Sequence, residues 1–232
     1  MAGQSVGNIE ITSAAGSVTT LALDSDRNIS LNAGMDLTTN ALDAGNNIST
    51  LSGGDTSVGQ QTAGGTVTAD SDGTYTSRRL ISSTGAIDIT SDDTASIAGV
   101  NSGSTTDISS ATSDILLSRD LTSADSIVLT AAGDVIASAQ NITSTTGDID
   151  INADLLSTGN IVLTAAGDLT TMAIDVDGNI DLNANLNLRA IGSLTSGGDV
   201  TADSTTGAIN ICLLYTSPSP RDLSTSRMPS SA

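Results

Sequence analysis

Residue types that carry most enzyme chemistry are scarce in this sequence of 232 residues. It contains no histidine, lysine, tryptophan or phenylalanine, and its one cysteine is Cys212. Tyr75 is the only tyrosine before Cys212. Without histidine, acid–base catalysis would have to rest on carboxylates alone. We therefore predict that the protein is not an enzyme, and that it has no catalytic residues, no bound metal and no cofactor.

Positive charge is also scarce. Residues 1–211 contain five basic and 25 acidic residues, so their net charge is 5 − 25 = −20, against −19 for the whole chain. The acidic residues are aspartates except Glu10, and the five basic residues are Arg27, Arg78, Arg79, Arg119 and Arg189. A phosphate backbone repels such a chain when it lacks basic clusters and stacking aromatics. The composition excludes nucleic acid as a partner and disfavours anionic lipid headgroups.

Long apolar runs are missing as well. No segment approaches the ~18–20 apolar residues of a membrane-spanning helix, so we expect no membrane insertion of this segment. The first ten residues lack the charged start and apolar core of a signal peptide. Because the repeat described below begins almost at once, we expect Met1 to be an internal methionine of a longer protein.

The last part of the chain differs from the rest. Residues 212–232 read CLLYTSPSPRDLSTSRMPSSA and contain all three prolines and the only cysteine. The peptide matches translated sequencing-adapter DNA: a transposase adapter encodes 212–222, a sample index 223–225 and a flow-cell adapter 226–232. A biological Ser/Pro linker is the alternative. We predict two parts, a repeat segment at 1–211 that is truncated at both ends, and an artefactual, unstructured tail at 212–232.

What is present is a repeat. The pattern Gly-Asn-Ile-x-Ile/Leu recurs about every 20 residues, and self-similarity at a short fixed period is typical of solenoids. Close copies begin at Gly7, Arg27, Gly159 and Gly178, and looser ones at Asn46, Gly65, Gly85, Asp125, Gly147 and Gly198. The spacing is irregular in places: only 12 residues separate Gly147 from Gly159, and nine separate Gly198 from Gly207. We interpret these places, and the polar stretch 51–80, as bulged or looped-out coils.

Each repeat contains three short apolar alternations separated by Gly, Asn, Asp or Ser, which indicates short strands and tight turns. Three such strands can close one turn of a parallel β-helix, filled by stacked aliphatic residues. The sequence therefore predicts an all-β parallel β-helix (solenoid) of about ten coils of roughly 20 residues. Disorder is the alternative that the Ser/Thr/Gly/Asp content would favour, but random polar tracts do not keep a register.

Asparagine precedes the isoleucine in many copies. We assign these residues to one register, in which stacked amides and left-handed turns stabilise the coil; they are Asn8, Asn28, Asn47, Asn141, Asn160 and Asn179, with Asp148 and Asp199 as substitutes. The alternative is glycosylation, because Asn28, Asn47 and Asn141 begin formal sequons.

Aspartate pairs at turns offer a possible calcium site. Carboxylates lie two residues apart at three turns, in the pairs Asp24 and Asp26, Asp70 and Asp72, and Asp175 and Asp177. Hard cations require several such oxygen ligands. The competing interpretation is an aspartate-stabilised turn, since no complete calcium motif occurs. Asp92-Asp93, the only adjacent acidic pair, is expected to face solvent, and Thr74-Tyr75-Thr76 is a weak match to an ice-binding face.

The pattern GNIxLxAxxDLTTxAI, clearest over 161–180, resembles the filamentous-haemagglutinin-like exoproteins of Gram-negative bacteria and related giant β-strand-repeat surface proteins. The resemblance implies a non-enzymatic stalk of a large adhesin, secreted or displayed on the Gram-negative outer surface. Its partners would be glycans or proteins of host or neighbouring cells, bound through regions missing here. The alternatives are a calcium-stabilised extracellular repeat protein and a polysaccharide-active β-helix enzyme.

Overall fold

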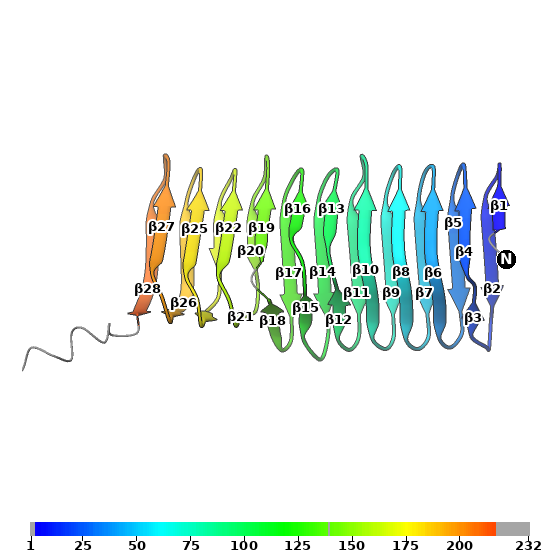
Figure 1. Cartoon of the computed structure of the whole chain (residues 1–232), viewed down its shortest axis with the longest axis horizontal. Coiled ribbons are helices and arrows are strands. Elements are labelled where there is room, and N and C mark those ends of the chain that lie inside the picture. Colours follow the sequence, from blue (N-terminus) through cyan, green and yellow to red (C-terminus); the bar gives the residue numbers. More distant parts are fainter. Residues whose placement is uncertain (1–2, 139, 217–232) are drawn as a thin grey trace, which may run out of the picture.

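The computed structural model describes residues 3–138 and 140–216, and the regular secondary structure of these residues is entirely β-strand. Their strands pair in parallel and wind into a solenoid of about ten turns, with about 20 residues per turn. Figure 1 shows the turns stacked along one axis, from β1 at one end to β28 at the other. No helix among the described residues could span a membrane. The predicted all-β parallel solenoid is confirmed.

Each turn has three faces, which we name A, B and C in chain order. Face A contains β2 (Ile9–Ser13), β5 (Ile29–Ala33), β7 (Ile48–Ser52), β9 (Val67–Ser71), β11 (Ile87–Ser91), β14 (Thr106–Ser110), β17 (Ile127–Ala131), β20 (Ile149–Ile151), β23 (Leu169–Thr171) and the first halves of β26 (Leu188–Ser196) and β28 (Ile209–Thr216). Face B contains β3 (Val18–Thr19), the first halves of β6 (Leu37–Ala44), β8 (Thr56–Ala63) and β10 (Tyr75–Ser82), then β12 (Ala95–Ile97), β15 (Ile115–Leu117), β18 (Asp134–Ala137), β21 (Asp154–Ser157), β24 (Ile174–Val176) and the second halves of β26 and β28. Face C contains β1 (Gly3–Ser5), β4 (Ala22–Ser25), the second halves of β6, β8 and β10, then β13 (Val100–Ser102), β16 (Leu121–Ser123), β19 (Asn141–Ser144), β22 (Ile161–Ala165), β25 (Ile180–Ala184) and β27 (Val200–Ser204).

Strict alternation of side chains builds these faces. Along β7, the first, third and fifth residues are buried and the others are exposed, as expected for strands with one face on a core. In β6 the alternation changes phase between Asn40 and Ala41, where the chain turns the corner between faces B and C. In other turns the same segment consists of two separate strands, for example β12 and β13.

The core consists of aliphatic ladders that run along the axis. Ile161 pairs in register with Ile180 and Leu163 with Leu182, and all four side chains are completely buried. Because each buried residue contacts its counterparts in adjacent turns, the core depends on nearest-neighbour contacts between turns. The stacking and burial expected for Ile161 and Ile180 are confirmed.

The repeated pattern occupies two different faces, and this corrects the single register that we expected. The copies at Ile29 and Ile48 lie on face A, whereas those at Ile161 and Ile180 lie on face C. Ile149 of the copy at Gly147 is on face A, so the 12-residue interval to Gly159 runs from face A to face C within one turn. The nine-residue interval from Gly198 to Gly207 runs from face C to face A of the next turn. The spacing therefore requires no looped-out coil.

The polar stretch 51–80 also forms regular turns. Its strand β8 pairs in register with β6 in the preceding turn and with β10 in the following turn. At the other end, β28 pairs with β26 through Thr216. The expectation of an unstructured tail beginning at Cys212 thus does not hold for 212–216, whereas 217–232 lie outside the described residues.

Candidate functional site

Amide and carboxylate oxygens at the corners hold successive turns together. At the corner before face A, the backbone N–H of Asn28 donates to Oδ1 of Asn8 at 3.3 Å. The backbone N–H of Asn47 donates to Oδ1 of Asn28 at 3.1 Å, and that of Thr66 to Oδ1 of Asn47 at 2.8 Å. Each side chain therefore accepts a hydrogen bond from a backbone N–H of the next turn, which the strand hydrogen bonds leave unpaired at the corner.

The asparagines form separate ladders and not the one that we predicted. Before face C, the backbone N–H of Asn179 donates to Oδ1 of Asn160 at 2.9 Å, and that of Asp199 to Oδ1 of Asn179 at 2.9 Å. Asn141 instead donates its backbone N–H to Oδ1 of Asp120 at 3.0 Å. Asparagine and aspartate are interchangeable in this role because both present an acceptor oxygen at the same distance from the backbone.

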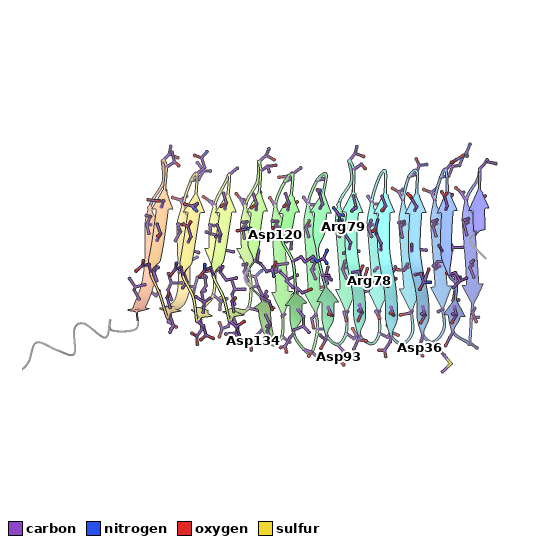
Figure 2. The ribbon with its side chains drawn as sticks, viewed as in Figure 1. Asp36, Arg78, Arg79, Asp93, Asp120 and Asp134 are labelled. Atoms are coloured by element: carbon purple, nitrogen blue, oxygen red, sulfur yellow. The ribbon has the colours of Figure 1, made fainter. Side chains whose placement is uncertain are left out.

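Aspartates at the corner between faces A and B have the same role. Oδ1 of Asp36 accepts the backbone N–H of Asp55 at 3.1 Å, and Oδ1 of Asp114 accepts that of Asp134 at 2.9 Å. Figure 2 places Asp36, Asp93 and Asp134 along one edge of the solenoid, at this corner. The recurrence of aspartate at turns thus reflects contacts between coils.

Buried serines complete the corners, a role that we did not predict from the sequence. Ser71 Oγ donates to the carbonyl of Gly54 at 2.8 Å, and Ser91 Oγ to that of Gly73 at 2.8 Å, in each case in the preceding turn. Both serines are completely buried. The sequence feature that could have predicted this role is a serine four residues after the first apolar residue of a strand, as Ser71 follows Val67.

The aspartate pairs considered for calcium do not come together into a larger cluster. Asp70, Asp72, Asp175 and Asp177 are exposed. Among residues 3–138 and 140–216, no three acidic or cysteine side chains are placed to hold a metal ion. Calcium takes six to eight oxygen ligands, which two adjacent carboxylates cannot supply alone.

The structure also shows the positions of the adjacent acidic pair and of the segment considered as an ice-binding face. Asp92 and Asp93 are exposed, as expected. Tyr75 points into the core and is completely buried, with its hydroxyl oxygen accepting a hydrogen bond from Nε2 of Gln61 at 2.7 Å. Burial raises the pKa of Tyr75 far above its ordinary value, outweighing its hydrogen bonds to Ser77 and Gln61. Thr76 faces outward, but its register partners in the adjacent turns are Ser57 and Ser96, so Thr74-Tyr75-Thr76 is not part of a threonine ladder of the kind that an ice-binding surface requires.

The outer surface of face A carries one pair of stacked carboxylates. Asp88 and Asp107 occupy the same register position in adjacent turns. Partial burial, together with the charge of Asp88, raises the pKa of Asp107. No bound group is needed to explain this shift, because partial burial and a like charge one strand spacing away both disfavour ionisation.

A groove on the outer surface, at the corner between faces B and C, is positively charged. This arginine groove is lined by Arg79, Gly99, Asn101, Arg119 and Thr122, with Arg78 and Asp120 at its edges, and has a volume of about 350 Å³. Three arginines and one aspartate give it a charge of 3 − 1 = +2. From the sequence we expected a chain without basic clusters, and this is wrong for the folded chain. The separation of 40 residues between Arg79 and Arg119, about two periods, was the signal.

Comparisons with known proteins add no assignment to these surfaces. Neither a protein-family model, nor a curated protein, nor a solved structure matches the chain.

Proposed function

We propose that residues 1–211 are a non-enzymatic structural stalk segment of a large bacterial adhesin or exoprotein that is secreted or held at the Gram-negative cell surface. The observation that carries the proposal is the continuity of the solenoid. Aliphatic ladders and corner oxygens bind each turn to the next from β2 to β27. At a rise of ~4.8 Å per turn, ten turns give a rod of about 50 Å.

The sequence resemblance to filamentous-haemagglutinin-like exoproteins supports this role. A stalk holds a binding region away from the cell, and it requires length and stiffness more than a reactive centre. Glycan or protein partners would then be bound through other regions of the protein. Antibodies raised against residues 1–211 are expected to label intact, unpermeabilised cells that express the full gene. Labelling that requires permeabilised cells would contradict a surface location.

Calcium removal tests the main alternative. Because the aspartate pairs are exposed and form no larger cluster, we expect the melting temperature of the repeat segment to be the same in calcium and in EDTA. A ligand that binds only the native state raises its apparent stability, so a calcium-dependent rise would favour a calcium-stabilised repeat protein. Thermal melting followed by circular dichroism at several calcium concentrations makes the comparison.

The enzyme alternative has its own test. Incubation with neutral and acidic polysaccharides, followed by assays for reducing ends and for unsaturated products, is expected to show no cleavage. Cleavage that copurifies with the intact chain would overturn the stalk proposal, and substitution of the exposed Asp92 and Asp93 would then show whether that pair is responsible.

A further inference from the structure

The fold gathers three of the five arginines of residues 1–211 at one place on an otherwise acidic rod. Leu80 pairs with Val100, and Val100 pairs with Leu121, so three consecutive turns meet at the start of face C. This register places Arg79 one turn before Gly99 and Arg119 one turn after it. The two arginines are therefore separated by two strand spacings, about 10 Å along the axis, a distance that two long side chains can bridge from opposite sides.

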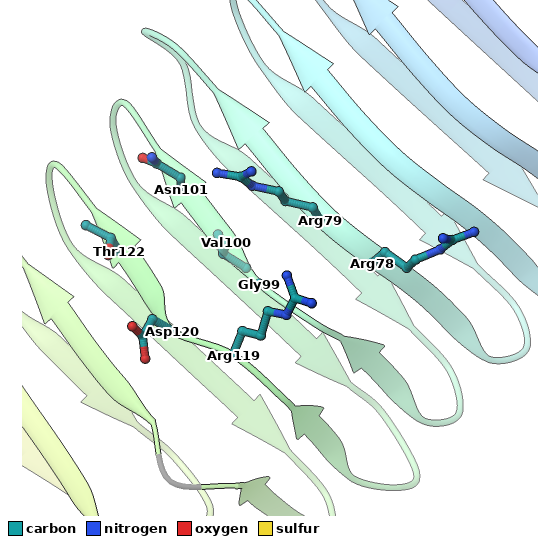
Figure 3. Close-up of a pocket in the computed structure, with 8 residues that line it drawn as sticks. All are labelled: Arg78, Arg79, Gly99, Val100, Asn101, Arg119, Asp120 and Thr122. Carbon is teal, nitrogen blue, oxygen red and sulfur yellow. The ribbon is translucent and has the colours of Figure 1, made fainter.

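The two guanidinium groups are available for a ligand. Among the described residues, neither the guanidinium of Arg79 nor that of Arg119 forms a salt bridge or a hydrogen bond; the backbone carbonyl of Arg79 accepts a hydrogen bond from Ser77 Oγ at 3.4 Å. The neighbouring carboxylate of Asp120 is directed away from them and accepts the backbone N–H of Asn141 at 3.0 Å (Figure 3). Each guanidinium has five N–H donors in a planar arrangement that matches a carboxylate.

Gly99 forms the floor of the groove. At many other corners a Cβ would collide with the backbone of the adjacent turn; at Gly85 it would lie 2.5 Å from the carbonyl carbon of Gly65. At Gly99 the nearest atom would be Cβ of Arg119 at 3.4 Å, which is an ordinary contact. The coil therefore does not require glycine here for packing. Gly99 is buried and lines the groove between the turns of Arg79 and Arg119, with the aliphatic stem of Arg119 lying over it.

The charge of the whole chain limits which anion can enter. With a net charge of −19, the protein repels polyanions at long range, and this excludes nucleic acids and densely charged glycans. A ligand with one carboxylate on an otherwise neutral body avoids that repulsion. The exposed Asn101 and the half-buried Thr122 lie beside the arginines on face C and can hydrogen-bond to hydroxyl groups.

We propose that the arginine groove binds the carboxylate of a uronic-acid sugar within a mainly neutral glycan. Arg79 and Arg119 hold the carboxylate above Gly99, while Asn101 and Thr122 contact the sugar hydroxyls. The proposal concerns the surface of this segment itself, so it does not depend on the stalk being part of an adhesin.

Titration with two matched sugars tests the proposal. Methyl glucuronide and methyl glucoside differ only in whether the sixth carbon is a carboxylate, and binding to the ¹⁵N-labelled full chain can be followed by NMR. We expect the glucuronide alone to bind, weakly and with shifts centred on Gly99 and Asn101. Equal binding of the glucoside, no binding of either sugar, or equal affinity for inorganic sulfate would each overturn the proposal.

Variants locate the site. The double substitution Arg79→Gln/Arg119→Gln is expected to weaken glucuronide binding at least about tenfold, with an unchanged melting temperature because both side chains are exposed. Arg189→Gln removes an exposed arginine from face A and is the matched control, with affinity unchanged. Gly99→Glu, which places a carboxylate on the floor, is expected to abolish binding. An equal loss in Arg189→Gln, or full binding in the double variant, would contradict the assignment.

Discussion

At the scale of single residues, the molecule uses small polar side chains as connectors. The corner oxygens of Asn47 and Asp114 each accept a backbone N–H from the next turn, and Ser91 donates to a carbonyl of the previous one. Buried backbone groups must be paired, and a coil corner cannot pair them by strand hydrogen bonds alone. The abundance of Asp, Asn and Ser is thus a consequence of having three corners in every turn.

Tyr75 is the exception to this aliphatic and small-residue design. Its hydroxyl group accepts the hydrogen bond from Gln61, whose buried Oε1 has no hydrogen-bond partner among the residues that the structure describes. Tyr75→Phe leaves the Gln61 amide unpaired and is expected to cost about 1–3 kcal/mol in the free energy of unfolding. Urea denaturation measures this cost. The double variant Tyr75→Phe/Gln61→Met is the control, and it should recover part of the loss because both polar partners are removed together.

The burial of Tyr75 can also be tested through the stability of the protein at alkaline pH. The pKa of Tyr75 in the folded state lies above the ordinary value of about 10. Above pH ~10 the unfolded chain therefore releases this proton while the folded chain keeps it, and stability falls as pH rises. Below pH ~10 the effect is absent. Denaturation at pH 8 and pH 11 should show a larger loss in the parent protein than in Tyr75→Phe; equal losses would contradict the burial of Tyr75.

At the scale of strands, stability depends on ladders of identical residues. Ile161 is completely buried and is stacked on Ile180. Ile161→Asp places a charge in an apolar interior with no partner, which is expected to cost several kcal/mol and to disrupt β22 and β25 locally. Thr164→Asp, on the outer side of the same strand, is the control and should cost less than about 1 kcal/mol.

Hydrogen exchange together with thermal melting distinguishes the outcomes of this pair of variants. Protection of backbone amides from exchange is expected to fall in β22 and β25 of Ile161→Asp and to persist in β5 and β7, which belong to turns several strand spacings away. An unchanged melt for Ile161→Asp, or equal losses in the two variants, would argue against the inward ladder.

The strands also show which features the apolar pattern of the sequence could predict and which it could not. The alternation of apolar residues predicted β22 and β25 and their stacking, because inward residues must be apolar at every second position. It did not predict which face each copy occupies. The local sequences around Ile48 and Ile161 are alike, since both combine a corner and a strand, yet they lie on faces A and C.

At the scale of the whole molecule, the solenoid is a stack of interchangeable turns, and this allows a deletion test. Removing residues 48–66 deletes one turn and joins Asn47 to Val67, which occupies the register position of Ile48. Since each turn contacts only its neighbours, the shortened chain is expected to fold with a melting temperature close to that of the parent. Circular dichroism and small-angle X-ray scattering check the fold and the slightly shorter rod.

A deletion of half a turn is the matched control. Removing residues 48–56 shifts face A onto face B and misaligns every later ladder relative to the first two turns. We expect this variant to lose cooperative unfolding or to aggregate. If both deletions behaved alike, stacking in register between turns would not be the source of stability.

The arginine groove also depends on the winding of the whole chain. Arg78 and Arg79 are visible as a pair in the sequence, but Arg119 joins them only because two turns of nearly equal length separate them. A shift of a few residues in either turn would place Arg119 on another face. Composition alone therefore suggested a chain without basic clusters, although the folded surface has one.

The sequence by itself determined that this chain winds into a parallel solenoid of turns of about 20 residues, because its period and alternation leave no other way to bury the apolar positions. It also determined that acids would populate the corners. Only the tertiary structure decided which face each repeat occupies and which distant residues become neighbours. The physical reason is that corners and strands are locally alike on every face, whereas face and neighbourhood depend on the summed length of all preceding turns.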